Sequence, residues 1–174
     1  ILSFFLLFFL FGLNNNHLFA QTGFGNLVTP DNYKKEIDLD TLYKYKFGDD
    51  PSWASPEFDD SAWRSVLADS TDNDTLFRKY EGILWFRGKF KVGSTLANNP
   101  FTIEILPFGA CEVYFDGKLV KTLGKVASKK EDFRSAFSMN TTMIPVALNG
   151  RTEHSIAIRF AKFKEEQKGT IVFN

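Results

Sequence analysis

The sequence has little cysteine and histidine and no net charge, and each shortage excludes a class of protein or site. Cys111 is the single cysteine, so the chain forms no internal disulfide. The two histidines are His17 and His154, and one histidine on a predicted strand builds neither a His-rich metal site nor a His-based catalytic triad. The 21 basic side chains match 21 acidic ones, without the basic excess that nucleic-acid binding requires. The sequence therefore predicts no metal, no cofactor, no catalytic residues and no nucleic-acid partner.

Charge is also absent from the first 20 residues, where residues 1–13 are apolar apart from Ser3 and Gly12. As a helix at about 1.5 Å per residue this run is about 20 Å long, short of a hydrocarbon core of roughly 30 Å. A polar cluster follows, and Ala20 supplies the small residue of a cleavage site. We predict a helical signal peptide at residues 1–20 and an exported protein, periplasmic or at the cell surface. A buried core helix is the alternative.

The chain starts inside this apolar run and not at Met, and we expect it to be part of a longer protein with a membrane anchor. Residues 21–41 are mixed and polar, which predicts a lead-in with a short pairing segment. Residues 42–174 have the length of one domain and bury a sizeable core without disulfides.

Alternation of apolar and polar residues dominates this domain and predicts half-buried antiparallel strands. One more strand is expected at residues 169–173. The residues expected to face the core are Leu84, Phe86, Phe90, Val92, Phe101, Ile103, Ile105, Cys111, Val113, Phe115, Ile156, Ile158 and Phe160. Their neighbours, among them Trp85, Arg87, Glu112 and Tyr114, fall on the opposite, polar face. Placed among apolar neighbours, Cys111 is expected to be an inert core thiol and not a nucleophile.

Turn signals separate the strands. Asp116-Gly117 is a strong two-residue hairpin signal, because both residues accept the positive φ of a type I′ turn, and Asn149-Gly150 is similar. The one helical signal is a single turn at residues 59–63, capped by Asp59 or Asp60. Closely spaced strands without repeated helices predict an all-β fold, an antiparallel β-sandwich or jelly roll.

Residues 47–63 are rich in aromatic and acidic side chains and allow two interpretations. In the first, Trp53, Phe58 and Trp63 anchor an irregular segment that closes one end of the sandwich. In the second, Trp53 is an exposed platform that stacks on a sugar ring, with the nearby carboxylates accepting hydrogen bonds from its hydroxyl groups. Both interpretations stay open at this point.

Trp85 and Arg87 share one face of a strand, which predicts a cation–π contact or a buried ion pair. Alternatively, Arg87 meets a ligand carboxylate or a neighbouring domain. With Glu112, which lies on the outward face of another strand, Trp53 and Arg87 are the candidate ligand-binding residues.

Four motifs in order, FDDSAW at 58–63, GILWFRGKF at 82–90, GACEVYFDGKLV at 109–120 and HSIAIRF at 154–160, carry a resemblance over residues 42–160. The chain resembles the galactose-binding-like jelly roll that opens family 2 glycoside hydrolases. It is similar also to the sandwich that precedes the membrane helices of bacterial sensor kinases and serine phosphatases. The residues Gly124-Lys125-Val126 after the hairpin are typical of the signalling version.

The resemblance implies two functions. In the first, the domain is an extracytoplasmic sensor that binds a small ligand such as a carbohydrate and belongs to a membrane signalling protein. In the second, it is the non-catalytic sugar-binding domain of a family 2 glycoside hydrolase. Either function implies neighbouring domains of the parent chain as partners. A purely structural domain is a third, weaker alternative.

Overall fold

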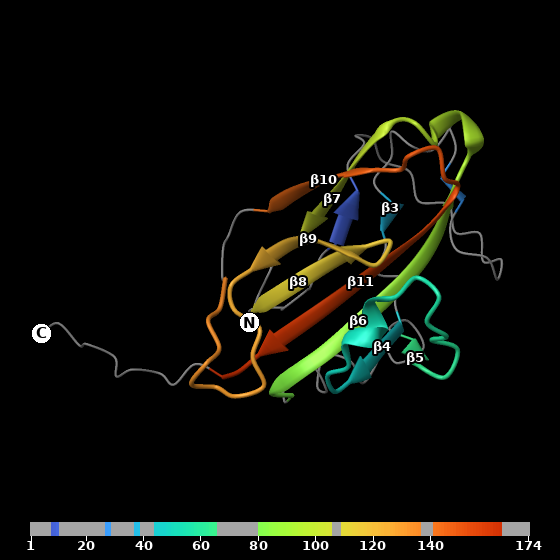
Figure 1. Cartoon of the computed structure of the whole chain (residues 1–174). Coiled ribbons are helices and arrows are strands. Elements are labelled where there is room, and N and C mark those ends of the chain that lie inside the picture. Colours follow the sequence, from blue (N-terminus) through green and yellow to red (C-terminus); the bar gives the residue numbers. More distant parts are fainter. Residues whose placement is uncertain are drawn as a thin grey trace, which may run out of the picture.

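The computed structural model describes residues 44–65, 80–105, 109–136 and 141–164, together with the backbone of residues 8–10, 27–28 and 37–38. Its strands form two sheets, drawn in Figure 1. The small sheet has the order β10 (Thr142–Ala147), β7 (Pro100–Ile105), β1 (Phe8–Leu10) and β3 (Ile37–Asp38). The large sheet has the order β5 (Arg64–Ser65), β4 (Lys44–Phe47), β6 (Gly82–Val92), β11 (Glu153–Lys162), β8 (Ala110–Phe115) and β9 (Lys118–Leu123).

Among the described strands nearly all pairing is antiparallel, and there only β2 (Leu27–Val28) runs parallel to its neighbour β6. The described helices are the short 3-10 helices η2 (Pro51–Ala54) and η3 (Ser94–Leu96). None of the described helices is long and apolar enough to cross a membrane. The predicted all-β antiparallel sandwich is therefore confirmed.

The apolar core between the two sheets, here called the inner core, consists mainly of the residues that alternation selects. In the large sheet, β6 contributes Leu84, Phe86, Phe90 and Val92, and β8 and β11 add Cys111, Val113, Phe115, Ile156, Ile158 and Phe160. From the small sheet, β7 contributes Ile103 and Ile105. Each is almost inaccessible to solvent. Because successive side chains of a strand point to opposite faces, the strand register follows from the sequence pattern.

Both predicted turns form. Asp116 and Gly117 have φ values of 48° and 78° and join β8 to β9. Asn149 and Gly150, with φ values of 53° and 74°, precede β11. These left-handed backbone conformations favour glycine and asparagine, which is why the sequence signals are reliable.

Three expectations differ from the structure or lie outside it. Of the predicted helical leader the structure describes Phe8–Leu10, which is strand β1 beside β7 and not helix, since an extended segment satisfies the hydrogen-bonding groups of a strand edge. The single turn capped by Asp59 forms at residues 59–63, with the Trp63 N–H donating to the Asp60 carbonyl oxygen at 3.0 Å and the Ser61 N–H donating to Asp59 Oδ1 at 2.9 Å, but it is a turn and not a helix. The strand predicted at residues 169–173 lies outside the described residues.

The outer face of the large sheet is the main departure from simple alternation. It is not exposed, because residues 48–63, here called the crossing segment, run across it (Figure 1). They bury a second cluster, here called the outer layer. The buried members of the outer layer are Trp53, Ala54, Trp63, Ile83, Trp85, Ala110, Val126, Ala157 and Ala161, with Phe58, Tyr114 and Phe133 packed against them.

Candidate functional site

The segment over the outer face is held by its own turns before it contacts the sheet. The Asp50 side chain accepts the Ser52 N–H at 2.9 Å and caps η2, and Pro51 presets the backbone of its first turn. Hydrogen bonds from the side chain and backbone of Ser52 stabilise the carboxylate of Asp50 and lower its pKa. Helix η2 then places the Trp53 ring edge-on to Trp63 and Trp85, with ring centroids 5.1 and 6.2 Å away.

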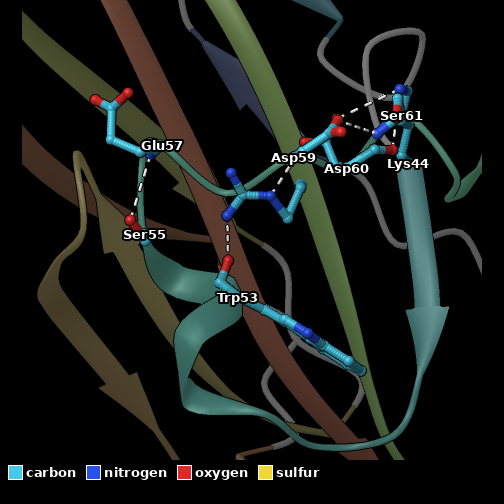
Figure 2. Close-up of polar contacts among 8 residues, drawn as sticks. Lys44, Trp53, Ser55, Glu57, Asp59, Asp60 and Ser61 are labelled. Atoms are coloured by element: carbon cyan, nitrogen blue, oxygen red, sulfur yellow. Dashed lines mark hydrogen bonds and ion pairs between the residues drawn. The ribbon is translucent and has the colours of Figure 1, made fainter.

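Arg87 is the buried cation of the outer layer, with 1% of its surface exposed. Its Nε lies 3.0 Å from Asp60 Oδ2, and its Nη1 donates to the carbonyl oxygen of Trp53. Figure 2 shows Asp60 shared with Lys44 of β4, whose Nζ lies 3.3 Å from Asp60 Oδ1. The aromatic partner of the guanidinium is Phe58, with Cζ 5.4 Å from the ring centroid.

The predicted buried ion pair of Arg87 is therefore confirmed, with Asp60 as the acid. A cation–π contact is also formed, but with Phe58 of the crossing segment. The strand neighbour Trp85 instead stacks on Tyr114 at 5.6 Å and donates its Nε1–H to Asp49 at 3.2 Å. Trp85 and Arg87 therefore share one face of β6, but the segment that covers this face gives each side chain a different partner.

Trp53 itself is 8% exposed. This burial matches its interpretation as an anchor, and the ring is not an exposed platform. The side chain of Lys46 lies over its ring, with Nζ 4.9 Å from the centroid. Direct ligand contact by Trp53 or Arg87 stays a prediction that the burial of both side chains does not favour.

Glu112 belongs to a polar network on the same face. One oxygen of its carboxylate lies 3.1 Å from Arg159 Nη1, and the other accepts the Tyr114 hydroxyl at 2.8 Å. Arg159 also makes a two-point contact with Asp49, at 2.7 and 2.6 Å. Hydrogen bonding to Arg159 holds the pKa of Asp49 below its usual value, and burial with the nearby Glu112 raises the pKa of Tyr114 to about 12. This network ties the crossing segment to β11 and β8.

A cleft of about 420 Å³ opens beside the outer layer, where the crossing segment meets the ends of the strands. One wall comes from residues 56–57. The other comes from the last residues of β6 and the first residues of β11, and Asp116 of the β8–β9 turn also lines the cleft. The residues that line this cleft are Pro56, Glu57, Lys89, Phe90, Lys91, Asp116, Arg151, Glu153, His154 and Ser155.

The floor of the cleft is fixed by contacts of Asp116 and His154. Asp116 Oδ1 accepts the Ser155 N–H at 2.9 Å, and Asp116 Oδ2 lies 2.8 Å from His154 Nδ1. The other ring nitrogen lies 3.1 Å from the Arg151 carbonyl oxygen, and the imidazole stacks on Phe115 with centroids 5.1 Å apart. Both side chains are therefore held in place before a ligand arrives.

The turn beneath this floor is closely packed. Gly117 has a positive φ, and a Cβ atom there would lie 2.8 Å from Pro56 Cδ. The crossing segment thus rests directly on the β8–β9 turn, and a larger residue at position 117 would push the two apart.

Another hollow, of about 460 Å³, lies where β7 begins and β10 ends. Its lining is uncharged and consists of Asn98, Asn99, Pro100, Phe101, Thr102, Pro145, Val146 and Ala147. It lacks the fixed charged groups that orient a polar ligand, so the charged cleft is the stronger candidate site.

Within the described ranges, no group of three His, Cys, Asp or Glu side chains is placed to hold a metal ion. Cys111 is buried in the inner core, and its burial raises the pKa of the thiol to about 12. The predicted core position of Cys111 is confirmed.

The sequence did not single out the cleft residues, although a usable signal was present. Lys89 follows Arg87 on the same face at a spacing of two, and Asp116 lies at a predicted hairpin turn. In an antiparallel sheet that turn lies beside the start of β11. The position of residues 56–57 carried no comparable signal.

Comparisons with known proteins gave matches among solved structures only. No protein-family model and no curated protein matches the chain. A β-glucuronidase from Bacteroides uniformis aligns with a TM-score of 0.47 and 17% identity, over 70% of this chain and 14% of that one. A Lactobacillus rhamnosus β-glucuronidase gives 0.46 and 17%, over 69% and 20%. A Ruminococcus gnavus β-glucuronidase in complex with D-glucuronic acid gives 0.42 and 15%, over 71% and 21%. The chain thus spans a fifth or less of the length of the first two.

Proposed function

We propose that this sandwich is the non-catalytic carbohydrate-binding domain of a larger exported protein. The observation that carries the proposal is the charged cleft, in which segments distant in the sequence bring prearranged polar side chains to one end of the fold. Its volume of about 420 Å³ is in the range of small-molecule sites. Sugar hydroxyl groups both donate and accept hydrogen bonds, and the cleft offers donors on Lys89 and Arg151 and an acceptor on Glu57.

The parent protein that we propose is a glycoside hydrolase of the family 2 type. The motif order FDDSAW, GILWFRGKF, GACEVYFDGKLV and HSIAIRF supports this choice. In that arrangement the domain binds saccharide beside a catalytic domain and contributes no catalytic group.

A sensory domain of a membrane signalling protein is the second candidate, and residues Gly124-Lys125-Val126 favour it. Val126 is buried in the outer layer, and the backbone of Lys125 pairs with Arg134. These contacts give residues Gly124-Lys125-Val126 a structural role under either function. The reading frame downstream distinguishes the two candidates, since several apolar segments of about 20 residues belong to the sensor.

Export to the periplasm or cell surface is part of the same proposal. It rests on the apolar, uncharged residues 1–20 and on Ala20 at the end of that segment. Expression with and without residues 1–20, followed by fractionation, tests it. The full chain is expected outside the cytoplasm, whereas retention of both forms in the cytoplasm would contradict export.

The binding function is tested by calorimetric titration of the full chain with a panel of neutral and acidic oligosaccharides. At least one is expected to bind, and Glu57→Gln is expected to weaken binding without changing the melting temperature. Glu131→Gln, in an exposed turn away from the cleft, is the matched control and should bind as the wild type does. Absence of saccharide binding, or turnover of aryl glycosides that a carboxylate substitution abolishes, would contradict the proposal.

A further inference from the structure

The lysine, arginine, aspartate and glutamate side chains that line the cleft balance one another in charge. The basic ones are Lys89, Lys91 and Arg151, and the acidic ones are Glu57, Asp116 and Glu153. The cleft therefore has no excess of either sign with which to attract an acidic or a basic ligand. Its selectivity depends on which of these charges the protein itself already pairs.

Two of the three acids are paired within the protein. Lys91 Nζ lies 2.7 Å from Glu153 Oε1, and this hydrogen bond lowers the pKa of Glu153. Arg151 Nη1 lies 3.5 Å from Asp116 Oδ2, and the same oxygen lies 2.8 Å from His154 Nδ1. These groups form the surface of the cleft and satisfy one another.

Lys89 and Glu57 are the remaining pair, and they belong to opposite walls of the cleft. Both side chains are exposed. The backbone N–H of Glu57 donates to Ser55 Oγ at 3.3 Å, but within the described residues its carboxylate has no partner. The Lys89 ammonium group likewise has no partner there, and the two form no ion pair with each other. The cleft thus holds one free donor group and one free acceptor group.

The backbone sets the distance between these two walls. Lys89 lies on β6, which is paired with β4 and β11 on its two sides and faces Ser155 at this position. Glu57 follows Pro56, whose ring rests on the β8–β9 turn at Gly117. The half-buried Pro56 also gives the cleft an apolar surface on which the C–H face of a sugar ring can pack.

Sugar hydroxyl groups fit this arrangement because a hydroxyl both donates and accepts hydrogen bonds. The hydroxyls of one saccharide can donate to Glu57 and accept from Lys89, and such charge-assisted bonds are about twice as strong as neutral ones. An acid group on the ligand accepts from Lys89 but is repelled by Glu57. A basic group is favoured by Glu57 but repelled by Lys89.

We propose that the cleft selects an uncharged saccharide whose hydroxyl groups bridge Glu57 and Lys89. This inference rests on the proposed function and specifies the ligand class of the same site. Because no net charge on the ligand is involved, its affinity should change little with ionic strength.

The test is calorimetric titration of the full chain, in slightly acidic buffer, with two series of probes that differ in charge. One series is cellotriose with the matching glucuronic acid and glucosamine trimers. The other is methyl β-galactoside with the matching galacturonic acid and galactosamine glycosides. In a series that binds, the uncharged member is expected to bind about tenfold more tightly than either charged member, since each charge loses one ionic hydrogen bond.

The tightest-binding probe of these series and of the oligosaccharide panel decides the outcome. An uncharged probe in that place supports the inference. A charged probe in that place overturns the inference and leaves the proposed function standing. Failure of every saccharide to bind removes the proposed function and this inference together.

Variants place the ligand between the two free charges. Glu57→Gln and Lys89→Gln are each expected to weaken binding of the uncharged probe about tenfold. Glu57→Gln should also narrow the gap to the acidic probe, and Lys89→Gln the gap to the basic probe, because the repelling charge is gone. Lys121→Gln on β9 and Glu131→Gln remove exposed charges outside the cleft and are the matched controls. Unchanged binding in either cleft variant, or an equal loss in its control, would overturn the bridging of the two walls.

Discussion

The inner core and the outer layer use the two faces of the same strands in different ways. The inner core is made mainly of aliphatic and phenylalanine side chains contributed by alternate strand positions. The outer layer packs three tryptophans, Trp53, Trp63 and Trp85, edge to face, and it includes the buried Arg87. Apolar packing is enough for the first region, whereas the second depends on specific polar partners as well.

The difference arises from the covering element. The inner core is closed by the opposite sheet, whose backbone groups pair within the sheet. The outer layer is closed by an irregular segment whose carbonyl groups need other donors, and Arg87 donates to one of them, at Trp53. The buried charge is then balanced by Asp60, so the outer layer is predicted to be the more sensitive region to loss of a single polar group.

The largest expected effect is at Asp60. Asp60→Ala leaves Arg87 buried without its acid, and loss of one partner of a buried pair costs about 4 kcal/mol. Urea denaturation should show this loss in the free energy of unfolding. The double variant Arg87→Met with Asp60→Ala should recover part of it, since the uncompensated charge is gone. Equal destabilisation of the single and double variants would contradict the role given to the pair.

Ile158 and Ala157 are neighbours on β11, but Ile158 lies in the inner core and Ala157 in the outer layer. Substitutions at these two positions therefore compare the two faces directly. Ile158→Ala opens a cavity in the inner core and is expected to cost about 3 kcal/mol. Ala157→Val adds volume under the outer layer, opposite Arg87, and is expected to cost about 1–2 kcal/mol by overpacking. Denaturation curves measure both. An unchanged stability in Ala157→Val would mean that the crossing segment is not closely packed.

Acid should act on the outer layer through Asp49. Its pKa lies below the unfolded value of 3.8, because Arg159 stabilises the carboxylate. The contribution of the pair is therefore complete above pH 3.8 and is lost as the pH falls through the lower, folded pKa. Arg159→Met should be less stable than wild type by about 1 kcal/mol at pH 7. That difference should shrink below pH 3.8, and a constant difference down to pH 2 would contradict the assignment.

The smallest effect is expected at Cys111 in the inner core. A thiol whose pKa is raised to about 12 is almost entirely protonated at pH 8 and reacts slowly. Iodoacetamide should leave the folded chain unmodified, as judged by mass spectrometry, and should modify it once urea unfolds it. Rapid modification of the folded chain would mean that the inner core opens locally.

The inner core could be predicted from the sequence because alternation depends only on strand geometry. Every inward residue expected on β6, β8 and β11 lies in it, and the Asp116-Gly117 and Asn149-Gly150 turns form where their backbone preferences put them. The outer layer could be predicted only in part. The anchoring role of Trp53 was one of two interpretations, and the acid paired with Arg87 was not identified.

The candidate cleft was missed for a physical reason. Its lining joins residues 56–57, the end of β6, a turn and the start of β11, and the path of an irregular segment is not encoded in a periodic pattern. Trp53 and Arg87 were chosen for their chemistry, but the same chemistry makes them structural anchors when a segment covers them. Lys89, two residues further along the strand, is beyond that cover and faces solvent.

The account depends most directly on where saccharide contacts the fold. A two-dimensional NMR titration of the full chain with the saccharide of the panel that binds most tightly measures this residue by residue. The account predicts shifts concentrated at Glu57, Lys89, Arg151 and Ser155, with the inner core and the exposed Leu119 of β9 unchanged. Shifts centred on β7 and β10, or the absence of any shift with every saccharide of the panel, would contradict it.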